Sequence, residues 1–472
     1  MKNHTRPARR AIVGASILLS LALALPVLVA PSQAAPLIKP NRLSQHVEAR
    51  SLLAAVQGGE LLGTPPLPAL VTGAGATLTS PDFWANWTHD VLQNNRVLLP
   101  LPTDVIKPDV VLPHVRVENG ATNPLPTATP RTNFRRITYQ WAGRTRSVGD
   151  FLRDTNTDAI LVARNGSLVA QAFANGYSAS QTHHAWSMTK SYVSTLIGIA
   201  QDEGRIASLD DPVQRYIPEL ANTAWKGTSI RNLLLMRSGM RWDEHTEKIN
   251  QNDQFLQWID MALDYYSNGS MGRTRNEYLR DMPRVGLQGK EFNYNSANTQ
   301  VLGWVLESIY KRPLNKVLSM KLWKPLGMQA HADLMTDRKG DVLGSMSLQA
   351  LPIDYVRFGE MMRNGGLAAN GRQIVSSNWV HQATTGMLPA QDAGDLRPSA
   401  YGFQWWSGAT PKGFQANGFQ GQFTTVVPEQ CVTAVRLAHT IQFSTSGEFG
   451  GQGDDEWKAV VRAVSRSIGG CA

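Results

Sequence analysis

The chain has 472 residues but only two cysteines, Cys431 and Cys471. Zinc sites need more ligands than two thiols, and a cysteine nucleophile needs a histidine partner. The scarcity therefore excludes a cysteine-rich metal domain. Two alternatives stay open for the pair: a disulfide, which an oxidising compartment would favour, or two unpaired thiols with one of them buried.

Charge is also sparse. Charged residues make up 18% of the chain, and no run of five or more lysines and arginines occurs. The formal net charge is +9, of which the first 34 residues carry four positive charges and no acid, leaving +5 for the remainder. This mild excess predicts no nucleic-acid partner. The hydrophobic fraction of 42% is instead typical of a globular protein with a large core.

The sequence has no His-Glu-x-x-His, no Gly-x-Ser-x-Gly and no phosphate-binding loop. A histidine pair, His183-His184, has no acidic or cysteine residue following it at a ligand spacing, so we interpret it as loop structure. Asp210 and Asp211 are interpreted as turn and cap residues. We therefore predict neither a metal nor a cofactor.

Residues 1–34 read as a secretory signal peptide. Basic side chains in the first ten residues precede an apolar run over 17–30, and Ser32-Gln33-Ala34 offers small residues for cleavage. The alternative is a membrane anchor, but the run is short for a span and contains Pro26. We predict a periplasmic or secreted protein without membrane contact after cleavage. No cysteine lies near the cleavage site, which argues against a lipid anchor.

The remaining chain divides into two parts. Residues 35–135 are rich in proline, asparagine and threonine, which predicts an extended arm. Within 136–472, apolar runs at 159–163 and 168–173 flank Asn165-Gly166, the signature of a hairpin with a type I′ turn. Runs at 423–427 and 432–437 predict two more strands near the C-terminus.

Helices are expected between these strands. Residues 187–202 are apolar nearly all round, which predicts a buried helix. Further helices are expected over 228–237 (capped by Thr228), 298–310 and 355–364, and a last one is expected from a cap at Asp454 to Gly469. The fold class is therefore α/β (α+β): an antiparallel sheet from both chain ends, flanked by helices, with a mostly helical insertion at about 205–345.

Ser187-Met188-Thr189-Lys190 is the first candidate for chemistry. Residues three apart share a helix face, so Lys190 can reach the Ser187 hydroxyl and act as its base if burial lowers the lysine pKa. The pattern recurs at Ser308–Lys311, at the end of a predicted helix, where the dipole favours a charged lysine. Ser187 stands at the start of a buried helix and is the better candidate.

Two further segments carry chemistry only in combination with the first. Tyr294, just before a predicted helix, is either a proton shuttle or a half-buried structural residue. The segment Gly418-Phe419-Gln420-Gly421-Gln422 leads into a strand, where glycines allow a close backbone approach. It is either part of an oxyanion hole or a simple turn.

Together the three segments resemble the serine β-lactamase and penicillin-binding-protein superfamily, in its class C-like branch. Supporting stretches are 207–213, 233–240 and 401–406. The chain looks most like the 6-aminohexanoate-dimer hydrolases and related esterases. The resemblance covers about residue 150 to the C-terminus and implies a β-lactamase/transpeptidase-like domain.

The resemblance also implies roles. Ser187 would be acylated, Lys190 would activate it, and Tyr294 would shuttle the proton. The backbone N–H groups of Ser187 and Phe419 would form the oxyanion hole. The substrate-binding set that it implies is Ser296, Gly418, Gly421 and Gln422.

Two positions depart from the lactamase pattern. The second motif has Ser296 where asparagine is usual, and the third reads Ala416-Asn417-Gly418 without its lysine. That lysine would bind a substrate carboxylate, so we predict a small amide or ester as substrate. The alternatives are a β-lactamase or D-Ala-D-Ala carboxypeptidase, and a non-catalytic module that binds cell-wall fragments. The oligomeric state is not predicted.

Overall fold

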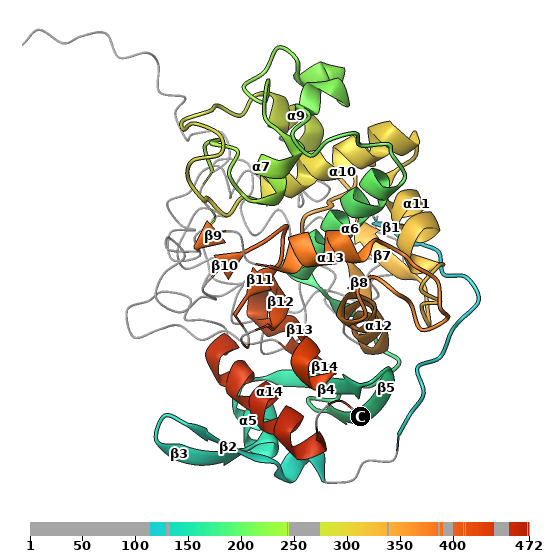
Figure 1. Ribbon diagram of the computed structural model, residues 1–472, viewed down its shortest axis with the longest axis vertical. Coiled ribbons are helices and arrows are strands. Elements are labelled where there is room, and N and C mark those ends of the chain that lie inside the picture. The colour runs from blue at the N-terminus through green and yellow to red at the C-terminus, as the bar shows by residue number, and fades with distance from the viewer. Residues whose placement is uncertain are drawn as a thin grey trace, which may run out of the picture. The chain divides into compact units, whose positions relative to one another are not determined.

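The computed structural model describes residues 114–128, 133–242, 244, 274–337, 339–385, 388–389, 400–408, 410, 412–438, 453–469 and 471 (Figure 1). The predicted signal peptide at 1–34 lies outside these residues, as does most of the predicted arm at 35–135. From the arm, the described residues include strand β1 (His114–Val117).

The largest sheet of the described residues has eight antiparallel strands in the order β5-β4-β14-β13-β12-β11-β10-β9. Their bounds are β4 Thr157–Arg164, β5 Ser167–Phe173, β9 Leu388–Pro389, β10 Ala400–Tyr401, β11 Trp406–Ser407, β12 Phe414–Gly418, β13 Gln422–Val427 and β14 Val432–Ala438. Strand β4 pairs with β14, with Leu161 opposite Val435. The prediction of an antiparallel sheet built from both chain ends is confirmed.

The first hairpin of this sheet has the predicted turn. Asn165 and Gly166 join β4 to β5 with φ of 49° and 78°. Two positive φ values in a two-residue connection are what a type I′ turn requires, and asparagine and glycine tolerate them best.

Alternation along the strands gives the sheet two apolar faces. Ile160 and Val162 pack with α5 (Val148–Asp154) and α14 (Asp454–Ile468). Leu161 and Val435 face the opposite side, in the core that contains α6 (Thr189–Asp202) and α12 (Pro352–Arg363). The sheet therefore lies between two helical layers (Figure 1).

The remaining elements surround this core. They are the hairpin β2 (Thr138–Trp141) and β3 (Arg144–Ser147), and the helices α7 (Ile230–Leu234), α9 (Arg275–Arg280), α10 (Ser296–Tyr310), α11 (Leu314–Leu318) and α13 (Ser377–Thr384). In the predicted insertion, α10 packs against both α6 and α7.

A second sheet positions the chain before Ser187. Its strands run in the order β1-β7-β8-β6, with β7 at Ala332–Met335, β8 at Gln349–Ala350 and β6 at His183–His184. The histidine pair, which we expected in a loop, is thus a short strand, because both residues pair with β8. His183 Nε2 also lies 3.0 Å from the Asp158 carboxylate.

Several helix ends differ from expectation: α7 ends at Leu234, not at 237, α10 begins at Ser296, not at 298, and α12 spans Pro352–Arg363, not 355–364. Residue 187 stands in a 3₁₀ turn (Trp186–Met188), and α6 begins at Thr189. Helix α7 is capped by Ser229, whose hydroxyl accepts a hydrogen bond from Asn232 N, while the hydroxyl of Thr228 accepts one from Arg284. Helix α14 has Gly453 as its cap.

Asp454 is therefore the first residue of α14 and not its cap. Its carboxylate binds Lys458 at 2.8 Å and the Gln415 amide at 2.7 Å, so it is paired inside the protein.

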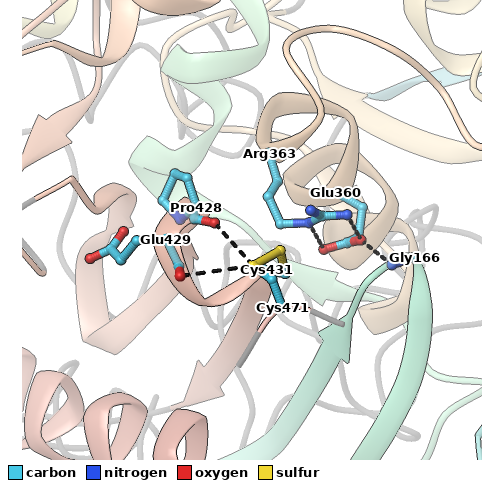
Figure 2. Close-up of a disulfide and its surroundings, with 7 residues drawn as sticks. All are labelled: Gly166, Glu360, Arg363, Pro428, Glu429, Cys431 and Cys471. Carbon is cyan, nitrogen blue, oxygen red and sulfur yellow. Dashed lines mark hydrogen bonds and ion pairs between the residues drawn. A yellow bond between two sulfur atoms is a disulfide. The ribbon is translucent and has the colours of Figure 1, made fainter. Parts of the chain in front are cut away.

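The two cysteines form a disulfide, Cys431–Cys471. Cys431 follows the turn between β13 and β14, and its carbonyl accepts a hydrogen bond from Asn165 N. Figure 2 shows the neighbouring Glu360, which accepts a hydrogen bond from Gly166 N at 2.8 Å and binds Arg363. The bridge thus ties the C-terminal segment to the end of the sheet where two hairpin turns meet.

Candidate active site

Ser187 stands in a turn that is held by several contacts. Trp186, directly before it, has φ of 48°, a left-handed conformation that is uncommon for a residue other than glycine. The turn is anchored because Ala185 N binds Leu348 O at 2.7 Å and Thr189 Oγ1 binds Trp186 O at 2.7 Å. Ser187 itself is partly exposed.

Lys190 lies one helical turn further on and is 1% exposed. Its Nζ donates to Ser187 Oγ at 2.7 Å and to the carbonyl oxygen of Ser345 at 3.1 Å. Burial lowers the pKa of Lys190 to about 8, while the negative charge of Glu244 raises it. A buried amine that is hydrogen-bonded to an accessible hydroxyl is the geometry that nucleophile activation needs.

Tyr294 approaches Lys190 from the loop before α10. The Lys190 Nζ is 5.0 Å from the centroid of the Tyr294 ring. The ring stacks on Trp406, with 5.8 Å between centroids, and meets Tyr401 edge-on. These aromatic contacts and the capping of α10 by Asn295 hold the tyrosine beside the lysine.

The end of strand β12 packs against the turn that carries Ser187. Gly418 passes so close to the serine turn that an added Cβ would lie 2.2 Å from the carbonyl oxygen of Ala185. The ring of Phe419 meets Trp186 edge-on at 5.4 Å, and Gln420 accepts a hydrogen bond from Trp186 Nε1 at 3.1 Å. The structure therefore brings all three sequence motifs together.

A family model described as beta-lactamase matches residues 146–455. The chain belongs to the β-lactamase family. A curated 6-aminohexanoate-dimer hydrolase of Paenarthrobacter ureafaciens is 27% identical over 381 residues, which are 79% of this chain and 91% of that protein. The resemblance stated from the motifs is thus confirmed, and the chain is a hydrolase of the β-lactamase fold.

Solved structures share this fold. A Bacillus anthracis protein described as a 6-aminohexanoate-dimer hydrolase has a TM-score of 0.65 at 24% identity, over 76% of this chain and 91% of that one. A Bacteroides dorei protein described as a β-lactamase has a TM-score of 0.51 at 19% identity, over 68% of this chain and 97% of that one.

The side chains predicted to bind substrate have partners within the protein. In this β-lactamase-family hydrolase, Ser296 Oγ donates to Glu244 Oε1 at 3.0 Å. The Gln422 amide donates to the carbonyls of Phe419 and Ala438 and accepts from Ala438 N. Gly421 has φ of 89° and forms the turn into β13. Their contact with substrate stays a prediction.

Sequence reasoning missed two groups that act on Lys190. They are the Glu244 carboxylate and the backbone carbonyl of Ser345. Glu244 directly follows Asp243 in the sequence, and no motif distinguishes it from that neighbour. Ser345 contributes a backbone atom, which no side-chain motif can reveal. Trp406 belonged to a stretch that supported the resemblance, but its stacking on Tyr294 was not foreseen.

The described residues contain no group of three or more histidine, cysteine, aspartate or glutamate side chains that could hold a metal ion. Burial lowers the pKa of His184 to about 3, so this histidine is neutral at physiological pH. Within the same residues, no helix is both long and apolar enough to cross a bilayer.

Proposed function

We propose that this protein is a serine hydrolase that cleaves short amide or ester bonds through an acyl-enzyme on Ser187. The observation that carries the proposal is the 2.7 Å hydrogen bond from the buried Lys190 Nζ to the partly exposed Ser187 Oγ. Burying an amine costs free energy, and a non-catalytic binding module has no use for a buried amine next to a solvent-accessible hydroxyl.

In this mechanism, Ser187 Oγ attacks the acyl carbon while its proton passes to Lys190. Tyr294 relays a proton to the leaving group, whose bond to the acyl carbon breaks. Water then attacks the ester on Ser187 and releases the acid, with the same groups moving protons in reverse. The N–H groups of Ser187 and Phe419 would bind the oxyanion; the contact of Gly418 with Ala185 supports this placement.

The third motif supports a substrate without a carboxylate beside the scissile bond. Ala416 and Asn417 are neutral, and the Asn417 amide oxygen accepts from Gln415 at 2.6 Å. A carboxylate buried here without a cation would be costly. The curated relative is named for 6-aminohexanoate dimer, which supports including short linear amides among the substrates.

A substrate panel tests this proposal. We expect hydrolysis of short acyl esters, slower hydrolysis of short linear amides, and weak penicillin turnover, because esters need less protonation of the leaving group. Ser187→Ala should abolish hydrolysis and labelling by a serine-directed phosphonate. Labelling of the Ala variant would disprove the nucleophile, and penicillin turnover with kcat/KM well above that of every ester would favour a β-lactamase.

We also propose that the protein is exported. The Cys431–Cys471 disulfide supports this, since disulfides persist mainly in oxidising compartments. Fractionation of cells that produce the full chain tests the proposal: a protein that stays in the cytosol with its N-terminus intact would contradict it.

A further inference from the structure

The Glu244 carboxylate lies at the N-terminus of α10, where three donors converge on it. Its Oε2 accepts from Ser296 N at 2.9 Å and from Trp242 Nε1 at 2.6 Å, and its Oε1 accepts from Ser296 Oγ at 3.0 Å. A carboxylate is favoured here because the first N–H groups of a helix carry a partial positive charge. Glu244 therefore connects the Trp242 segment to the residue two positions after Tyr294.

The same carboxylate lies close enough to act on Lys190 through its charge, since it binds Ser296, two residues after Tyr294, and the Tyr294 ring centroid lies 5.0 Å from Lys190 Nζ. Burial alone lowers the pKa of Lys190, and Glu244 works in the opposite direction. Among the described residues, Lys190 Nζ contacts the Ser187 hydroxyl, the Ser345 carbonyl and the ring of Tyr294. Tyr401 lies behind Tyr294, and burial holds the pKa of its phenol well above the usual value. Of these described groups, Glu244 alone carries a carboxyl side chain.

We propose that Glu244 is a positioning residue with two effects on the hydrolase site. It holds the segment that carries Tyr294, through Ser296 and Trp242, and it supplies the negative charge that acts on Lys190. The proposal rests on the proposed function, since it needs Lys190 as the base. A base that loses too much proton affinity accepts the serine proton poorly, so an anion nearby is useful.

The charge is tested with Glu244→Gln, read out as the pH profile of kcat/KM for an ester. The midpoint is the pH at which kcat/KM, rising with pH, reaches half of its plateau. Loss of the negative charge should move this midpoint to lower pH by about one unit, since a nearby opposite charge shifts a pKa by about 1 to 3 units. Glu244→Asp keeps the charge, so its midpoint should stay close to that of the wild type. A merely structural residue would change the rate without moving the midpoint.

The holding role is tested with Ser296→Ala. This variant removes one donor from Glu244 but leaves the charge in place. The plateau of kcat/KM should fall by about tenfold or more, the effect of one hydrogen bond to a charged group, while the midpoint stays where it is in the wild type. A midpoint that moves in Ser296→Ala as far as in Glu244→Gln would overturn the assignment of the two effects.

Glu291→Gln is the matched control, because Glu291 is an exposed acid three residues before Tyr294. Its profile should match the wild type. If Glu244→Gln has the wild-type midpoint, the proposal is wrong. Glu244→Ala, which leaves room for water at the three donors, is a second charge-free variant; if both fail to fold, Glu244 is structural and the proposal is again wrong.

Ser187→Ala separates the two proposals. If it abolishes hydrolysis while no Glu244 variant moves the midpoint, only the inference about Glu244 fails. If hydrolysis persists in Ser187→Ala, the proposed function itself fails, whatever the Glu244 variants show.

Discussion

Lys190 combines full burial with a short contact to a reachable hydroxyl, and burial gives it a pKa of about 8. To take the Ser187 proton, the amine must be neutral. Lowering the pH protonates it, so activity should be lost on the acid side of about pH 8 and gained above it. The pH profile of kcat/KM for an uncharged ester measures this; a profile that falls as pH rises through the same range would contradict the base role.

Substitution of Lys190 gives a second test at the residue scale. Lys190→Arg keeps a positive charge but cannot accept a proton at neutral pH. The loss should be roughly two to four orders of magnitude in kcat, the range typical of a general base. Lys311→Arg, in the second Ser-x-x-Lys of the chain, is the matched control and should keep normal rates, because Lys311 is exposed. Near-normal turnover in Lys190→Arg would move the base role to another group.

At the scale of elements, strand β12 and the serine turn depend on a glycine between them. Even a single added Cβ at Gly418 would lie 2.2 Å from Ala185 O. The branched side chain of Gly418→Val therefore forces β12 to move away from Ser187. We expect phosphonate labelling to slow by about 100-fold or more, the cost of losing an oxyanion donor. Phe419→Leu keeps the backbone in place and should label at close to the normal rate. The opposite order would show that the third motif is elsewhere.

At the scale of the whole molecule, the Cys431–Cys471 disulfide links the C-terminal segment to the large sheet. It joins residues 40 positions apart in the chain. Strand β13 runs from the Gly421 turn beside the site to the Pro428 turn beside Cys431, so the bridge and Ser187 lie at opposite ends of a six-residue strand. Cys431→Ser with Cys471→Ser should lower the free energy of unfolding by about 2–4 kcal/mol and leave kcat/KM unchanged.

Urea unfolding measures this effect of the bridge. Wild-type protein under reducing conditions should match the double variant, while the reductant should leave the variant itself unaffected. A loss of kcat/KM in the folded double variant would contradict the conclusion that the disulfide and the active site are independent.

Local sequence patterns predicted much of the fold and located the three site motifs. The Asn165-Gly166 turn, the alternating strands and the three-residue spacing of Ser187 and Lys190 each depend on near neighbours in the chain, so the sequence alone indicates them. Helix ends were less predictable, because Thr228 and Ser229 are both good cap residues: in the structure Ser229 accepts from Asn232 N, and the Thr228 hydroxyl accepts from the distant Arg284.

By itself, the sequence determined the family, the sheet built from both chain ends, and the three motifs. Only the tertiary structure decided which groups surround Lys190. Glu244 and Ser345 are 54 and 155 positions away from it in the chain, and neither stands in a recognisable pattern. The proton affinity of Lys190 was likewise decided by packing, because burial and a neighbouring charge exist only once α6, α10 and the loop at Glu244 come together.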